Sequence, residues 1–335
     1  MGKKVVILPN WVGDFLMAFA SLDPVMEKEN LLLCGKKGFY ELIRGKYKEE
    51  IWIEKEKGLA GALRTVRRLM KSPATTAVLL PNSFSSALIA TLSGMSKVVG
   101  IPKDGRFFLL TRKVKVDESL HQAEIYRRIL EEAGLSFEGG LTGRIYLSRN
   151  DRSWAEERLR ELGWEDKRIA VIHPGASKPE RCWPAERFGE IARRLEELNY
   201  KVAVVGSGKE AELGEKVAKS LSSESFYNLA KESVPLGKLS AFIEKAHIFV
   251  GNDSGPIHIA GACGLKVVGI YGPSLPEKTG PVMGEGGVFK GVSLRMDCSP
   301  CRERFFKECS PINGKPPCIW EITTEMVWEA LKTLL

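Results

Sequence analysis

Short apolar runs alternate with amphipathic helical stretches along the whole chain, in two successive series. This alternation is typical of α/β layers built on mostly parallel sheets. The first series predicts strands at 5–8, 31–34, 51–53, 77–80 and 98–99, and helices at 13–27, 59–70, 84–93 and 119–133. The second predicts strands at 169–173, 201–205, 247–250 and 267–271, and helices at 151–162, 184–198, 210–221, 235–246 and 257–263. We therefore expect two Rossmann-like doubly wound domains that face each other across a cleft. Ligands would bind in this cleft, at the carboxyl ends of the strands.

The length of 335 residues also suits two domains. The pattern predicts a boundary at residue 150, with one domain over 1–150 and the other over 151–322. A final helix at 323–335 is a candidate to pack back on the first domain.

Composition narrows the class of protein. Hydrophobic residues make up 44% of the chain and charged residues 27%, as in globular proteins. No apolar run approaches the roughly 18 residues of a membrane span, and the amino-terminal apolar run is too short for a secretory signal, so we expect a cytoplasmic protein. The net charge of +8 favours an anionic partner, which could be nucleic acid, an acidic lipid surface or an acidic sugar. Because no zinc-finger, RNP or helix-turn-helix pattern is present, we do not expect nucleic acid.

The segment 250–274 has the outline of an anion-binding site. A strand leads into the turn Asn252-Asp253-Ser254-Gly255, and Pro256 follows at a first-turn position that needs no backbone N–H. The free N–H groups of the next helix would face the strand tip, where a diphosphate would fit. An ordinary capped strand-turn-helix is the alternative.

His258 lies in the same helix, four residues after Ser254. Together with Asp253, it could contact a diphosphate or the transferred group. A lone histidine in a helix can equally serve packing alone.

A second turn follows the strand at 169–173. Gly175 would let a ligand approach the backbone, and Ser177 could donate a hydrogen bond. Lys178 and Arg181 are cations that could neutralise a diphosphate, since an arginine fork suits paired phosphate oxygens. A solvated basic loop is the alternative.

A third turn, VGSGKEAE at 205–212, contains Gly206 and Gly208, which permit close approach of a ligand. Glu210 or Glu212 could accept hydrogen bonds from ribose hydroxyls. The spacing is not that of a P-loop, and a glycine-rich turn with surface acids remains the alternative.

The turn PNWVGDF at 9–15 follows the first strand and lacks the GxGxxG pattern of dinucleotide-binding proteins. Asp14 opens the next helix, where its carboxylate could act as a general base or could simply complement the helix dipole. Trp11 could be a wall for a sugar ring or a packing residue.

The turn LPNSF at 80–84 offers Asn82 and Ser83. Together with nearby Arg106 and other basic residues, they could form a polar acceptor surface. A solvated loop is the alternative for the basic residues.

Four of the seven cysteines follow the spacing C-x2-C-x7-C-x8-C, namely Cys298, Cys301, Cys309 and Cys318. This spacing allows a structural zinc site, although the interval is shorter than in most zinc ribbons. Disulfides and reduced thiols are the alternatives.

Taken in order, these motifs resemble the ADP-heptose:lipopolysaccharide heptosyltransferases of glycosyltransferase family 9, and heptosyltransferase II most closely. The resemblance spans nearly the whole chain. It is carried by WVGD at 11–14, LPNSF at 80–84, PGA at 174–176, WP at 183–184, NDSG at 252–255, YGPS at 271–274 and CSPC at 298–301.

The resemblance implies a GT-B fold, with acceptor binding by the first domain and donor binding by the second. It also implies inverting transfer of L-glycero-D-manno-heptose from ADP-heptose to a heptose of the lipopolysaccharide inner core. Asp14 matches the family's catalytic carboxylate, and Arg181 matches a position where relatives often carry a lysine that contacts the diphosphate. The matching donor-binding residues are Ser177, Asp253, Ser254, Gly255 and His258. The family's ribose-binding acid aligns near Gly208, so Glu210 is only a candidate replacement.

No DxD-like motif is present, so we expect catalysis without a divalent metal or other cofactor. The expected partners are the ADP-sugar and an acidic, lipid-A-linked core oligosaccharide, with peripheral contact at the inner face of the inner membrane. A GT-B transferase or epimerase that uses another nucleotide sugar, and a noncatalytic nucleotide- or glycan-binding protein, are the alternatives.

Overall fold

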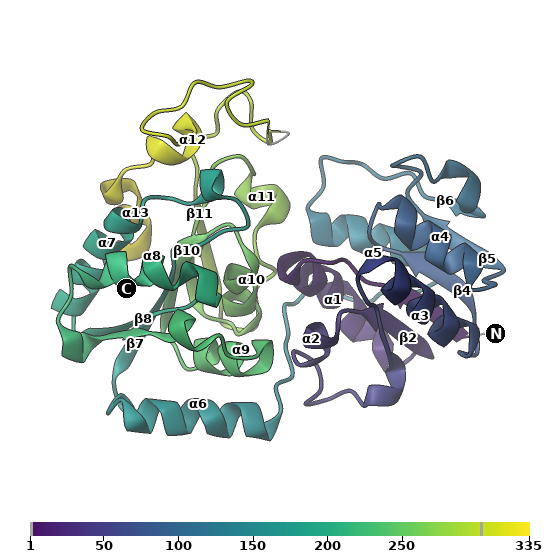
Figure 1. Ribbon diagram of the computed structural model, residues 1–335, viewed down its shortest axis with the longest axis horizontal. Coiled ribbons are helices and arrows are strands. Elements are labelled where there is room, and N and C mark those ends of the chain that lie inside the picture. Colours follow the sequence, from purple (N-terminus) through teal and green to yellow (C-terminus); the bar gives the residue numbers. More distant parts are fainter. Residues whose placement is uncertain (1–2, 302–303) are drawn as a thin grey trace. The chain divides into compact units, whose positions relative to one another are not determined.

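The computed structural model describes residues 3–301 and 304–335. The chain forms two compact units that divide between Leu147 and Ser148, close to the boundary predicted at 150 (Figure 1). Each unit is an α/β structure built on one six-stranded parallel sheet. The predicted pair of Rossmann-like doubly wound domains is therefore confirmed at the level of fold.

The sheet of the first unit has the strand order β3-β2-β1-β4-β5-β6. Its strands are β1 (Lys3–Ile7), β2 (Leu31–Gly35), β3 (Trp52–Glu54), β4 (Ala74–Leu79), β5 (Lys97–Gly100) and β6 (Arg112–Lys113). Its helices are α1 (Val12–Met26), α2 (Lys37–Tyr40), α3 (Gly58–Met70), α4 (Phe84–Leu92) and α5 (Gln122–Glu132), with 3-10 turns η1 (Glu49–Ile51) and η2 (Phe107–Leu109). Val5 pairs with Leu32 on one side and with Ala77 on the other, which places β1 in the centre.

The second unit repeats this plan in the order β12-β11-β10-β7-β8-β9. Its strands are β7 (Arg168–His173), β8 (Tyr200–Val204), β9 (Phe226–Asn228), β10 (Ile248–Asn252), β11 (Lys266–Ile270) and β12 (Val288–Val292). Its main helices are α6 (Arg149–Glu161), α7 (Ala185–Glu197), α8 (Ala211–Ala218), α9 (Leu236–Glu244), α10 (Gly255–Ala262) and α13 (Thr324–Lys332). The shorter helical elements are α11 (Pro276–Thr279), α12 (Pro317–Trp320), η3 (Pro179–Arg181), η4 (Gly208–Glu210), η5 (Ser223–Ser225) and η6 (Leu229–Glu232).

Both sheets reverse their strand order at one place, between β1 and β4 in the first unit and between β7 and β10 in the second. In open α/β sheets, ligands bind outside the carboxyl ends of the strands at this switch point. The turns at 8–11 and 80–83 meet this condition in the first unit, and the turns at 174–178 and 253–254 meet it in the second. The topology therefore selects four of the turns that the sequence analysis singled out.

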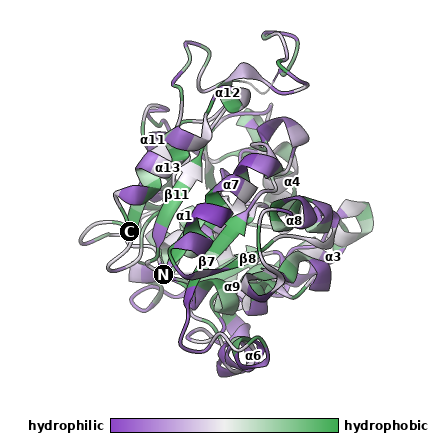
Figure 2. Cartoon of the chain, turned by 90° about the vertical axis from the view of Figure 1, so that its left-hand side faces the viewer, coloured by the Kyte–Doolittle hydropathy of each residue, from purple (hydrophilic) through white to green (hydrophobic). Residues whose placement is uncertain are grey.

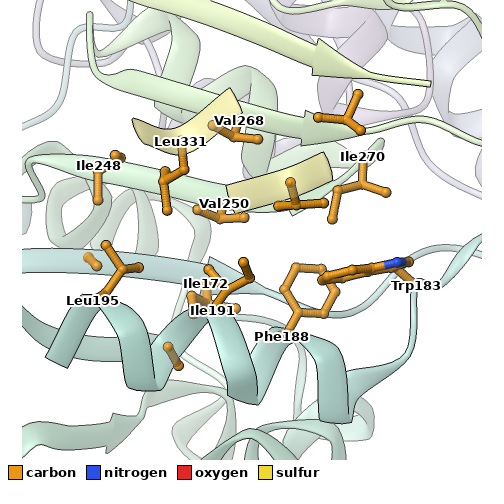
Figure 3. Close-up of a cluster of buried hydrophobic side chains, with 14 of the residues drawn as sticks. Ile172, Trp183, Phe188, Ile191, Leu195, Ile248, Val250, Val268, Ile270 and Leu331 are labelled. Carbon is orange, nitrogen blue, oxygen red and sulfur yellow. The ribbon is translucent and has the colours of Figure 1, made fainter. Parts of the chain in front are cut away.

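The core of the second unit lies between its sheet and helices α7 and α13. Ile172, Val250 and Ile270 from the strands pack with Phe188 of α7 and Leu331 of α13 (Figure 3). Each is fully buried, and burial of a side chain of this size contributes roughly 1.5–3 kcal/mol. The strands β7 and β8 are mostly hydrophobic, whereas helix α6 is mostly hydrophilic (Figure 2).

The suggestion that the final helix packs on the first domain is wrong. Helix α13 packs on α7, β11 and β12, all of the second unit. The reason is its apolar stripe, since Val327 and Leu331 are buried in the core described above.

The sequence analysis missed the outer strands β6, β9 and β12 and the one-turn helix α2. The strand β6 has two residues, β9 has three, and β12 is mostly exposed and contains Lys290 and Gly291. Short or exposed edge strands carry little of the apolar signal on which the prediction depends. No described helix is both long and apolar enough to cross a bilayer.

Candidate active site

The turn between β10 and α10 presents backbone N–H groups at the switch point of the second sheet. Ser254 is the N-cap residue, but its side chain makes no cap hydrogen bond. Its Oγ instead lies 3.1 Å from the Asn252 carbonyl oxygen and 2.9 Å from His173 Nδ1. Since the first N–H groups of a helix have no partners within the helix, this arrangement leaves the amino end of α10 without a side-chain cap and suited to an anion.

Asn252 attaches the second turn to this site. Its side chain is fully buried, donates from Nδ2 to the Pro174 carbonyl at 2.8 Å, and accepts from the Trp183 N–H at 3.1 Å. These bonds fix both ends of the loop that carries Ser177 and Lys178, which are themselves exposed. The sequence analysis treated Asn252 only as a turn residue, and its place at the end of a buried strand was the available signal.

Arg181 and Asp253 form an ion pair beside the α10 turn. Arg181 Nη2 lies 2.6 Å from Asp253 Oδ2, and the Ser274 hydroxyl donates to the same oxygen. Arg181, predicted as a diphosphate contact, therefore holds the carboxylate of Asp253. The pair neutralises a negative charge that would otherwise repel an anion at the end of α10.

Glu210 lies in the turn after β8, where its carboxylate is firmly held. Its Oε2 accepts from the Ser207 N–H and hydroxyl, both at 2.7 Å, and its Oε1 lies 3.5 Å from His173 Nε2. Burial alone would raise the pKa of Glu210, but His173 and Ser207 outweigh it and lower the pKa to about 2. The carboxylate therefore stays charged, and its hydrogen bonds from Ser207 hold the turn in place.

The glycines of this region make room for Glu210. A Cβ at Gly175 would lie 1.7 Å from Glu210 Oε1, and one at Gly206 would lie 3.0 Å from Oε2.

His173 is almost fully buried at the tip of β7. It connects the turn after β8 to the α10 turn, because it contacts both Glu210 and Ser254. The sequence analysis did not foresee this connection.

The remaining candidates of the second unit lie in α10 or on the loop before η3. His258 is buried within α10, and Gly255 is the first residue of that helix. Lys178 Nζ lies 5.7 Å from the centre of the Phe305 ring. The structure thus gathers Arg181, Asp253, Ser254, Gly255, Gly206 and Glu210 on turns linked by hydrogen bonds or ion pairs.

Asp14 lies in the first turn of α1, at the switch point of the first sheet. Its Oδ1 accepts a hydrogen bond from the Tyr126 hydroxyl at 3.0 Å. Burial and the neighbouring Asp14 raise the pKa of Tyr126 well above its usual value, so the phenol remains a donor. Tyr126 comes from α5 and was not foreseen, because 112 residues separate it from Asp14.

Trp11 stands beside this carboxylate in the chain and exposes 66% of its surface. Lys36 Nζ lies 5.8 Å from the Trp11 ring centre and donates to the Asn10 carbonyl. Burial and, to a lesser degree, Lys57 lower the pKa of Lys36. An exposed aromatic face and a cation therefore flank the end of β1.

Arg106 was predicted to bind the acceptor, and the structure contradicts this. Its side chain is fully buried, donates from Nε to the Ile101 carbonyl at 2.9 Å, and reaches the Pro81 carbonyl and Asn82 Oδ1. Burial lowers the pKa of Arg106 to about 10. Arg106 therefore clamps the turn after β4, and Ser83 caps α4 by accepting from the Ser86 N–H.

The four cysteines of the C-x2-C-x7-C-x8-C pattern lie near one another. Burial, followed by the charges of Cys301, Cys298 and Cys309, raises the pKa of Cys318 to about 12. No disulfide joins any two of the seven cysteines, all of which are described. Within residues 3–301 and 304–335, no three His, Cys, Asp or Glu side chains are arranged to hold a metal ion.

Known proteins share both the sequence pattern and the fold. Residues 62–309 match the family model of glycosyltransferase family 9 (heptosyltransferase). Lipopolysaccharide heptosyltransferase 2 of Escherichia coli (strain K12) is 27% identical over 316 residues, covering 87% of this chain and 88% of that protein. Lipooligosaccharide heptosyltransferase 2 of Haemophilus influenzae is 26% identical and covers 99% of both chains.

Among solved structures, that of E. coli ADP-heptose lps heptosyltransferase II superposes with a TM-score of 0.77 at 23% identity, covering 99% of this chain and 98% of that one. This likeness confirms the expected GT-B class of fold. The family match extends over well more than half of the chain. The chain therefore belongs to glycosyltransferase family 9, the heptosyltransferase family, and is a glycosyltransferase.

Proposed function

We propose that this glycosyltransferase moves L-glycero-D-manno-heptose from ADP-heptose to a heptose of the lipopolysaccharide inner core, with inversion at the anomeric carbon. The observation that carries the proposal is the open amino end of α10, beside the neutralised Asp253, in a chain of this family. The relatives named lipopolysaccharide heptosyltransferase 2 and lipooligosaccharide heptosyltransferase 2 support the choice of sugar and acceptor.

In this proposal, the second unit binds the donor. The diphosphate lies against the N–H groups at the start of α10, and the Ser177 hydroxyl and Lys178 of the preceding loop complete its binding. These donors are fixed before the reaction, so they stabilise the negative charge that grows on the leaving ADP. Glu210 and Gly206 form the wall toward the ribose.

Asp14 acts as the general base. It removes the proton of the acceptor hydroxyl as that oxygen attacks the anomeric carbon, the bond to the diphosphate breaks, and ADP leaves. Tyr126 occupies one lone pair of Oδ1 and orients the carboxylate. Every step uses side chains and backbone of this chain, and we propose that no divalent metal is needed.

The first unit binds the acceptor at its own switch point, where Asp14 lies. Trp11 offers a face for a sugar ring, and Asn82 and Ser83 offer polar groups on the neighbouring turn. The acceptor is acidic and linked to lipid A, so the enzyme works in the cytoplasm, in peripheral contact with the inner face of the inner membrane.

Calorimetry with ADP, UDP and GDP tests the donor assignment. We expect ADP to bind at least about tenfold more tightly than the other two nucleotides. A preference for UDP would instead identify a family member that uses a different donor. Gly175→Ala is a second test of this site. Its methyl group would collide with Glu210 and distort the site, so this variant should lose ADP affinity.

A further inference from the structure

The positive charge of the chain is concentrated in one segment. Residues 58–116 contain ten Lys and Arg residues and one acidic residue, Asp104. The whole chain has 50 basic and 42 acidic residues, so the remainder, with 40 and 41, is nearly neutral. Nine of the ten basic side chains are exposed, Arg106 being the exception.

Within the described part of the chain, ion pairing leaves about half of this charge without a counterion. Four of the basic side chains pair with acids outside the segment: Arg64 and Arg68 with Glu56, Lys103 with Glu118, and Arg112 with Glu132. Among the described residues, no ion pair involves Arg67, Lys71, Lys97, Lys113 or Lys115. Lys113 instead places its ammonium 3.3 Å from the centre of the Phe107 ring.

The same segment carries most of the exposed large apolar side chains. Of the fourteen such side chains among the described residues, eight belong to α3, α4 and η2. They are Leu59, Leu63, Met70, Phe84, Leu88, Leu92, Phe107 and Phe108. Leu59 is 83% exposed and Phe108 is 73% exposed, which is unusual for side chains of this size in a region with its own packed core.

These side chains gather on one side of the first unit. Helices α3 and α4 pack against each other (Figure 1), and η2 packs against α4. Phe84, Leu88 and Leu92 recur every four residues and so form one stripe along α4. The rings of Phe84 and Phe108 are 6.1 Å apart, which continues the stripe onto η2.

We propose that this surface, formed by α3, α4 and η2, docks on an anionic phospholipid bilayer. The apolar side chains enter the headgroup region, and the exposed Arg67, Lys71 and Lys113 contact lipid phosphates, as in amphipathic interfacial segments. A second copy of the chain would bring two strongly positive surfaces together, which the charge disfavours.

This inference rests on the proposed function for its purpose. The α4 stripe begins at Phe84, directly after Asn82 and Ser83 of the proposed acceptor turn. Docking through α4 therefore holds the acceptor turn next to the membrane in which a lipid-linked acceptor is embedded.

Flotation with vesicles tests the docking directly. We expect the wild-type chain to bind vesicles of 30% phosphatidylglycerol in phosphatidylcholine at least about tenfold more strongly than vesicles of phosphatidylcholine alone. Phe107→Ser with Phe108→Ser, and separately Arg67→Glu with Lys71→Glu, should each weaken that binding about tenfold or more. The matched control is Lys219→Glu with Lys290→Glu, which makes the same change in charge on exposed residues of the second unit and should leave most of the binding intact.

Three results would overturn the proposal: no preference for the anionic vesicles, an equal loss in the control variant, or a concentration-dependent dimer that the two double variants abolish without any vesicle binding.

A transfer assay separates this proposal from the enzymatic one. With a delipidated core oligosaccharide, the docking variants should transfer heptose at the wild-type rate. With a vesicle-embedded acceptor, they should lose activity in parallel with their binding. If the docking variants lose activity with both acceptors, the docking role is contradicted. If the wild-type chain itself is inactive with both acceptors, the proposed function is contradicted, and the vesicle binding then decides the docking proposal by itself.

Discussion

The two switch points share one strand order but differ in how their polar groups are paired. In the second unit, Arg181 holds Asp253 and His173 lies between Glu210 and Ser254, so side chains satisfy one another and leave backbone N–H groups at the end of α10 to face a ligand. In the first unit, Asp14 accepts a hydrogen bond from the Tyr126 hydroxyl, and the nearby Trp11 is exposed. The second switch point therefore has the fixed electrostatics that the proposed binding of a charged donor requires, whereas the first combines a carboxylate with an exposed aromatic face, as the proposed base and sugar-binding roles require.

Loss of the base should give the largest effect. Asp14→Ala and Asp14→Asn should lower kcat by about a thousandfold, since general base catalysis typically contributes 10²–10⁴-fold. ADP affinity, measured by calorimetry, should change by less than about twofold, because the proposed donor-binding groups belong to the second unit. Wild-type transfer by a folded Asp14→Asn protein would remove Asp14 from the mechanism.

The partly buried Glu210 should make the second unit sensitive to acid. Because its pKa is lowered from 4.5 to about 2, its stabilising contribution is complete above about pH 5 and is lost as the pH falls toward 2. Glu210→Gln should therefore remove stability on the order of 2 kcal/mol at pH 7 and much less at pH 3, as measured by denaturant unfolding. Glu212→Gln, an exposed neighbour, is the control, and an equal pH dependence of both variants would contradict the assignment.

The ion pair of the donor site should couple two substitutions. Arg181→Ala leaves the carboxylate of Asp253 without its cation, so ADP affinity should fall by about tenfold to thirtyfold. Adding Asp253→Asn to this variant should restore most of the affinity, because the repulsive charge is gone. If the double variant binds ADP as weakly as Arg181→Ala, then Arg181 contacts the diphosphate itself.

Removal of the Tyr126 hydroxyl should give the smallest effect. Tyr126→Phe deletes the hydrogen bond to Asp14, worth about 1 kcal/mol, and should lower kcat about fivefold with unchanged ADP affinity. Tyr47→Phe is a matched control, since it deletes a 2.7 Å bond to Asp23 in the same unit but away from the strand tips. Equal losses of kcat in both variants would mean that stability, and not the orientation of Asp14, is being measured.

The sequence predicted the interior strands and the turns at the switch points because both depend on local signals. Apolar runs mark buried strands, and turns such as NDSG mark helix starts. The partners that set the chemistry were missed because they are distant in the chain: Tyr126 reaches Asp14 across 112 residues, and His173 reaches Ser254 across 81. Arg106 was misread for the same reason, since only the folded turn after β4 shows that its guanidinium is buried against carbonyl groups.

The release of ADP from ADP-heptose in the presence of a purified inner-core acceptor is the decisive measurement. The proposed function predicts release that depends strictly on the acceptor and equals the heptose gained by it, with inverted configuration at the anomeric carbon. If the chain releases no ADP with this acceptor but turns over a different nucleotide sugar, the proposed function is contradicted.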